Sequence, residues 1–147
     1  MVHLLDVNVL VALFDADHVH HEAAHDWFAD HRADGWATCP STESGFARVV
    51  SHPAYGSGLR VAEAADHLRR FRASGHHVFW ADGTTLSDTA LFRLERLHGH
   101  REVSDVCLLG LAVSMGGRLA TFDRAIPVNA VHGATPDSVA VIGPADL

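Results

Sequence analysis

Lysine is absent from the sequence, so all eleven basic residues are arginines, and the formal net charge is −7. An acidic total argues against a protein that binds nucleic acid by bulk electrostatic attraction. Arginine nevertheless suits local, bidentate recognition of phosphate or carboxylate groups. The composition of the genome also accounts for such a bias, so the arginines alone assign no function.

Long apolar runs are also missing. No stretch approaches the ~20 residues that a bilayer-spanning helix needs, although 48% of the residues are apolar. The first residues carry no basic region or cleavage site, so we expect neither a signal peptide nor a membrane. Cys39 and Cys107 stand in apolar stretches without metal-ligand spacing. These absences predict a cytoplasmic protein with reduced thiols, and the length of 147 residues predicts a single domain over residues 1–147.

Short β-type runs alternate with helical patterns along the chain. The expected strands are residues 2–6, 36–39, 76–80, 118–122 and 138–143. The expected helices are residues 8–14, 18–31, 41–50, 61–71, 86–97 and 104–115. The sequence contains no linker or internal repeat. The pattern predicts an α/β fold with a mostly parallel sheet of about four to five short strands and helices on both faces.

Four acidic residues stand where these elements begin or end. Asp6 and Asp123 end two of the expected strands, whereas Glu43 and Asp105 lie in the first turns of two helices. Ligand sites of parallel sheets gather outside the carboxyl ends of the strands, so the four side chains are expected to converge at one edge. Each also has a local alternative. Glu43 and Asp105 can oppose helix dipoles and Asp123 can cap a turn, but Asp6 shows no obvious capping role.

Four carboxylates at one edge would repel and raise each other's pKa unless a cation lay among them. Oxygen ligands select hard ions such as Mg²⁺ or Mn²⁺, which keep several waters and commonly bind a substrate phosphate. Such an ion can orient and activate water for in-line attack on phosphorus. The set therefore predicts phosphodiester or phosphoryl chemistry without a protein nucleophile.

The sequence resembles the PIN-domain ribonucleases, specifically the VapC-type toxins of bacterial type II toxin–antitoxin pairs. The resemblance lies in LLDVNVLVAL at residues 4–13, CPSTESGFARV at 39–49 and SDVCLLGLAVSMGGRLATFD at 104–123. It implies a Mg²⁺- or Mn²⁺-dependent endoribonuclease that leaves a 5′-phosphate and forms a homodimer. It also implies a cognate antitoxin whose C-terminal segment occupies the active-site groove.

The resemblance implies roles for individual residues. The metal ligands would be Asp6, Asp105 and Asp123, with Asp6 and Asp105 the most direct, and Glu43 would complete the site directly or through water. Three polar residues would hydrogen-bond the acids or metal-bound water: Asn8, Ser104 and Thr121. No further acid follows in TFDRAIP, residues 121–127, so one well-occupied metal site is expected.

Several alternatives compete with this interpretation. A haloacid-dehalogenase-type phosphatase uses a second acid where this chain has Asn8, and both it and a phosphorelay receiver use a lysine. A PIN fold without turnover, acting only through its partner, stays open. His18, His21 and His25 lie near one face of the expected helix and could bind Zn²⁺, or they could form a solvated polar face. Arg101, shortly before Asp105, is a candidate contact for a substrate phosphate.

Overall fold

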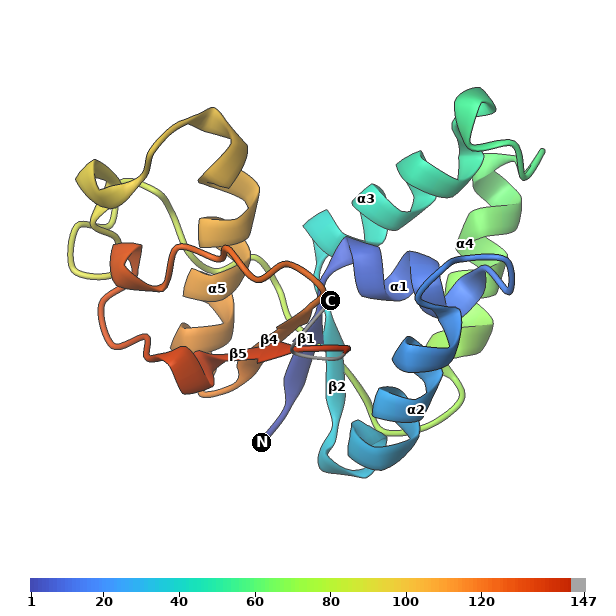
Figure 1. The fold of residues 1–147 in the computed structure, drawn as a ribbon, viewed down its shortest axis with the longest axis horizontal. Coiled ribbons are helices and arrows are strands. Elements are labelled where there is room, and N and C mark those ends of the chain that lie inside the picture. Colours follow the sequence, from blue (N-terminus) through green and yellow to red (C-terminus); the bar gives the residue numbers. More distant parts are fainter. Residues whose placement is uncertain (144–147) are drawn as a thin grey trace.

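A five-stranded sheet runs through the middle of the molecule, and every neighbouring pair of its strands is parallel (Figure 1). The computed structural model describes residues 1–143, and its strand order is β3-β2-β1-β4-β5. The strands are β1 (His3–Leu5), β2 (Trp36–Thr38), β3 (His77–Phe79), β4 (Arg118–Thr121) and β5 (Val139–Val141). The predicted α/β fold with short parallel strands is confirmed.

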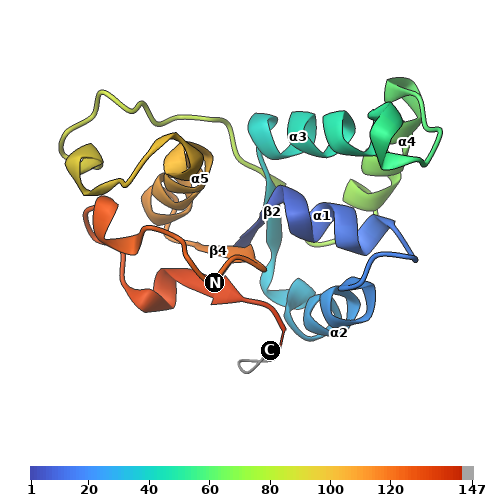
Figure 2. The ribbon, with the colours of Figure 1, turned by 45° about the horizontal axis from the view of Figure 1, so that its top comes forward.

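Helices cover both faces of the sheet, as predicted. On one side lie α1 (Val7–Phe14), α2 (His21–His31), α3 (Pro40–Ser51) and α4 (Val61–Arg72), and α5 (Val103–Ser114) lies on the other (Figures 1 and 2). None of the helices within residues 1–143 has the length and apolar character needed to cross a membrane.

The side chains of each strand point alternately to the two faces of the sheet, and this divides the interior into two apolar cores. Leu5 and Ala120 belong to the core under α1 to α4, whereas their neighbours Leu4 and Leu119 belong to the core under α5. This follows from strand geometry, because successive side chains point to opposite faces of a sheet. All four leucine and alanine side chains are fully buried. The sheet therefore separates an α1–α4 core from an α5 core.

The start of α1 fixes the position of α3. A Cβ atom at Gly45 would lie 2.6 Å from Cγ2 of Val7, closer than packed carbon atoms can approach. Glycine thus allows the first half of α3 to lie directly against the first residue of α1. Glu43, two residues earlier in α3, is thereby held near the end of β1.

The helix expected over residues 86–97 is not formed, and this prediction was wrong. Only a 3₁₀ turn at Leu94–Arg96 is helical there. The backbone instead pairs with the segment after β4: Phe92 bridges Val131, and the Arg93 amide donates to Ala130 O over 2.8 Å. Phe92 is buried against Gly110 of α5. This tertiary contact outweighs the weak local preference for helix.

The helix expected from His18 begins only at His21, and Val19, expected on its apolar face, is 86% exposed. Within residues 1–143 the histidines form no metal-binding group, and two of them do not lie on a purely solvated face. His21 Nδ1 lies 2.7 Å from Ala12 O, and His25 Nε2 lies 2.9 Å from Leu13 O. These imidazoles satisfy carbonyl groups at the C-terminal end of α1, which have no partner within the helix.

Candidate active site

Three of the predicted acids come together at the carboxyl edge of the sheet. Asp6 follows β1, Asp123 follows β4, and Asp105 lies in the first turn of α5. The proximity appears in their electrostatics, because the charge of Asp123 raises the pKa of Asp6, and both charges raise the pKa of Asp105. β1 and β4 are neighbours in the sheet, which places the two strand-end aspartates side by side.

Asp6 is held by hydrogen bonds from both sides. Its Oδ1 accepts from the Val7 amide over 2.7 Å and so caps α1, a role that the sequence analysis did not find. Its Oδ2 accepts from the Thr121 hydroxyl over 2.7 Å. The Thr121 oxygen in turn accepts from Asn8 Nδ2 over 3.3 Å and from the Asp123 amide over 3.1 Å. Thr121 therefore links the ends of β1 and β4, and Asn8 and Thr121 lie where supporting groups were predicted.

Asp123 also makes the turn contact that the sequence allowed. Its Oδ1 accepts from the Ala125 amide over 2.8 Å. Ser104 and Arg101 are both exposed, Ser104 in the first turn of α5 and Arg101 in the 3₁₀ turn His100–Glu102 that precedes it. The N-cap residue of α5 is Glu102. Neither residue is part of the Thr121 network.

Burial raises the free energy of the ionised forms of Asp6 and Asp105. Asp6 is only 8% exposed, and burial raises its pKa despite the bonds from Thr121 and Val7. Burial, followed by the charges of Asp6 and Asp123, raises the pKa of Asp105 to about 6. Burial and the neighbouring negative charges thus both disfavour the ionised forms of Asp6 and Asp105, and a cation between them would stabilise those forms.

The donor set fits a hard divalent cation. Asn8 Oδ1 is buried and has no hydrogen-bond partner within residues 1–143, and an unpartnered buried acceptor is costly unless a cation or water reaches it. With the three carboxylates it makes an all-oxygen set, which suits Mg²⁺ or Mn²⁺. Within the described chain, no three acidic, histidine or cysteine side chains already enclose an ion.

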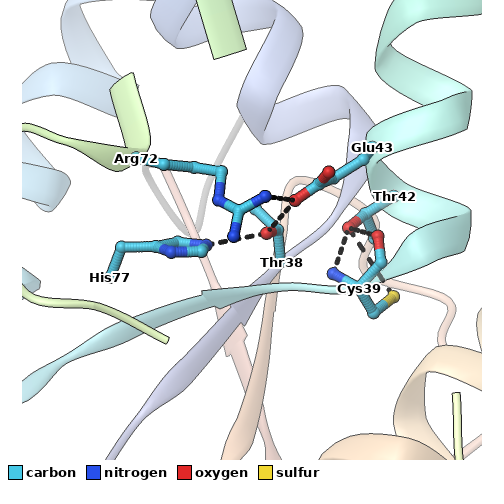
Figure 3. Close-up of polar contacts among 6 residues, drawn as sticks. All are labelled: Thr38, Cys39, Thr42, Glu43, Arg72 and His77. Carbon is cyan, nitrogen blue, oxygen red and sulfur yellow. Dashed lines mark hydrogen bonds and ion pairs between the residues drawn. The ribbon is translucent and has the colours of Figure 1, made fainter. Parts of the chain in front are cut away.

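Glu43 stands apart from the aspartates and has its own partners. Its Oε2 accepts from the Thr38 hydroxyl over 2.6 Å and lies 3.3 Å from NH1 of Arg72 (Figure 3). Thr38 ends β2, which neighbours β1, so Glu43 belongs to the same sheet edge. The sequence offered no signal for these partners, because Arg72 lies 29 residues away, in a run of arginines on a different helix.

Comparison with known proteins identifies the family. The model of the PIN domain matches residues 3–131, which include all four acids. Ribonuclease VapC44 of Mycobacterium tuberculosis is 45% identical over 139 residues, covering 95% of this chain and 98% of the relative. The chain belongs to the PIN domain family, among the VapC-type ribonucleases. Ribonuclease VapC39 of the same organism is 40% identical over 134 residues, 90% of this chain and 96% of the relative.

A solved PIN structure supports the fold independently. The crystal structure of Mycobacterium tuberculosis VapC20, described as a sarcin-ricin loop cleaving toxin, superposes with a TM-score of 0.60. The match covers 91% of this chain and 99% of that one at 16% sequence identity. At this identity the likeness establishes the shared PIN fold, and the resemblance stated from the sequence is confirmed at the level of family and fold.

Proposed function

We propose that this VapC-type protein is a Mg²⁺- or Mn²⁺-dependent endoribonuclease toxin with Asp6, Asp105 and Asp123 as its metal ligands. The observation that carries the proposal is the pair of desolvated carboxylates of Asp6 and Asp105, with Asp123 close enough for its charge to act on both, beside the unpartnered Asn8 oxygen. When bound, such an ion activates water for in-line attack on phosphorus and stabilises the leaving oxygen. Cleavage in this way leaves a 5′-phosphate.

The chain's own residues would orient the reactants. Thr121 and the Val7 amide hold the Asp6 carboxylate from its two sides. Glu43 would accept a hydrogen bond from water at the edge of the site. Arg101, exposed just before α5, would contact a phosphate of the RNA. With a net charge of −7, substrate binding must rely on such local contacts rather than on bulk attraction.

The first test is cleavage of a ribosomal and transfer RNA mixture by the purified protein, with 5′-end mapping of the products. We expect cleavage with Mg²⁺ or Mn²⁺, and a loss of at least about 100-fold when EDTA removes the ion. Cleavage that persists in EDTA would contradict the metal site. The control is the same preparation with the ion restored after EDTA treatment, which should recover its activity.

We further propose a homodimer in the cytoplasm and a cognate antitoxin that offers a basic side chain to the acidic edge. A cation from the antitoxin would complement the charge of Asp6 and Asp105. Induction of this chain in bacteria should arrest growth, and co-expression of the protein encoded beside it should relieve the arrest. Arrest without any RNA cleavage would favour a silent PIN-fold protein that acts through its partner.

The raised pKa of Asp105 predicts a pH-dependent gain in stability for Asp105→Asn. The pKa of Asp105 is about 6 in the folded protein, whereas in the unfolded chain it has the ordinary aspartate pKa of 3.8. The folded state therefore binds more protons in this window, and wild-type stability falls as pH rises from about 4 to 6. We expect Asp105→Asn to melt ~2–6 °C above wild type at about pH 7.5, with the difference lost near pH 4.

Thermal melting with and without Mg²⁺ checks the origin of this effect. Ligand binding to the folded state raises the melting temperature, so Mg²⁺ should stabilise wild type and leave Asp105→Asn nearly unchanged. Asp26→Asn, an exposed aspartate on α2, is the matched control and should behave as wild type. A gain in Asp105→Asn that is the same at both pH values would refute carboxylate repulsion as its cause.

A further inference from the structure

Glu43 ends a chain of polar contacts that runs across three other elements. Thr38 at the end of β2 contacts both Glu43 on α3 and His77 on β3, and Arg72 on α4 contacts Glu43 (Figure 3). The Thr38 oxygen lies 2.6 Å from Glu43 Oε2 and 2.7 Å from His77 Nε2. Thr38 is fully buried, so its hydroxyl has no competing water.

The direction of these hydrogen bonds follows from counting protons. A hydroxyl has one proton, and a carboxylate can only accept, so Thr38 donates to Glu43. The Thr38 oxygen must then accept from His77, which requires the proton of the imidazole to be on Nε2. Burial, with the nearby charge of Arg72, lowers the pKa of His77 to about 4, so the ring is neutral and carries a single N–H. The order is His77 to Thr38 to Glu43.

The two donors that reach Glu43 act on the same carboxylate oxygen. Thr38 and Arg72 both reach Oε2, whereas no donor within residues 1–143 reaches Oε1. Arg72 is itself positioned by Phe79. Its guanidinium carbon lies 5.1 Å from the centre of the Phe79 ring, which is a cation–π contact. Two directed donors on one oxygen fix the plane of the carboxylate and leave the other oxygen available.

The backbone that carries Glu43 is equally constrained. The Cys39 amide donates to Thr42 Oγ1 over 3.0 Å, which closes the first turn of α3. Gly45 sets α3 against Val7, the residue after Asp6. Glu43 is therefore fixed through its backbone relative to β1 and through its side chain relative to β2 and β3. Its orientation is defined without any contact to the three aspartates.

We propose that His77, Thr38 and Arg72 are positioning residues that hold Glu43 by Oε2 and present Oε1 to the acidic edge. The inference rests on the proposed ribonuclease function, in which Oε1 accepts a hydrogen bond from water in the site. The proposal also predicts whether each substitution raises or lowers the rate of RNA cleavage. If Arg72 instead held Glu43 away from the site, removing its charge would increase cleavage rather than reduce it.

The test compares Thr38→Val, Thr38→Ser, His77→Gln and Arg72→Gln in RNA cleavage, with Arg69→Gln as the matched control. Arg69 lies on the same helix as Arg72 and pairs with Asp66. We expect Thr38→Val and Arg72→Gln to lower kcat on the order of 10-fold or more with little change in KM. Thr38→Ser should restore most of the rate, and Arg69→Gln should match wild type. Circular dichroism establishes that each variant is folded.

Two further measurements separate positioning from a structural role. In a Glu43→Gln background, Thr38→Val should cause no additional loss of kcat, because the hydroxyl acts through Glu43. Long-range ¹H–¹⁵N spectra of the wild-type imidazoles should give the Nε2–H tautomer for His77 and should do so without substrate or metal. A wild-type Nδ1–H tautomer, faster cleavage by Arg72→Gln, or folded Thr38→Val with wild-type kcat would each overturn the proposal while leaving the ribonuclease function intact. Absence of cleavage by wild type would overturn both.

Discussion

Asp6→Asn should reduce RNA cleavage on the order of 100-fold or more, since it removes a charged metal ligand while preserving the shape of the side chain. Asparagine caps helices as well as aspartate does, so its oxygen can still accept from the Val7 amide. The amide nitrogen that replaces Oδ2 cannot accept from the Thr121 hydroxyl, which therefore loses this acceptor. The lost hydrogen bond costs about 1 kcal/mol, and the relief of a buried carboxylate offsets it.

The measurement is single-turnover cleavage of a defined structured RNA beside the denaturant-dependent unfolding of the same preparation. We expect activity to collapse while the free energy of unfolding stays within about 1 kcal/mol of wild type. Asp26→Asn, distant from the edge on α2, controls for loss of surface charge. Wild-type cleavage by Asp6→Asn, in protein free of host nucleases, would exclude Asp6 from the metal site.

Gly110→Ala should destabilise the fold, although alanine normally strengthens a helix. A Cβ atom at this position would lie 2.5 Å from Cζ of Phe92 and nearer still to Cε1. Phe92 is only 4% exposed, so its ring has no free space into which to turn. Forcing extra volume into a packed core costs about 1–3 kcal/mol, which exceeds the gain of roughly 1 kcal/mol in helix propensity.

A double-mutant cycle with Phe92→Leu tests the origin of this loss. The smaller leucine removes the ring that would meet the new methyl group, so the double variant should be more stable than the sum of the single effects predicts. The expected readout is chemical unfolding of the four proteins under one buffer condition. Additive effects would contradict a direct clash between positions 92 and 110.

The layout of the acidic edge was predictable because the strand–helix alternation is strong and local. Asp6 and Asp123 each follow an apolar run, and parallel strands bring such positions together regardless of their separation in sequence. The supporting roles of Asn8 and Thr121 came from the family resemblance, and in the structure Thr121 donates to Asp6 while Asn8 contacts Thr121. Such patterns can be recognised within one strand or helix at a time, so they can be predicted from a single sequence.

The remaining features depend on contacts between distant segments. The spacing of apolar residues at 86–97 is typical of a helix, but the pairing of Phe92 with Val131 determines the backbone conformation there. The partners of Glu43 lie on β2 and α4, which no local pattern joins. His21 and His25 satisfy carbonyl groups of a preceding helix, a role that becomes visible only when the packing of α1 against α2 is known.

The division of the interior by the sheet has a consequence for the acidic edge. Asp6 caps α1, which packs in the α1–α4 core, whereas Asp105 lies in the first turn of α5, which packs in the α5 core. An ion held by both would join the N-terminal ends of two helices that pack on opposite faces of the sheet. Ion binding would then stabilise the packing of both cores at once, because ligand binding to the folded state stabilises everything that must fold to form the site.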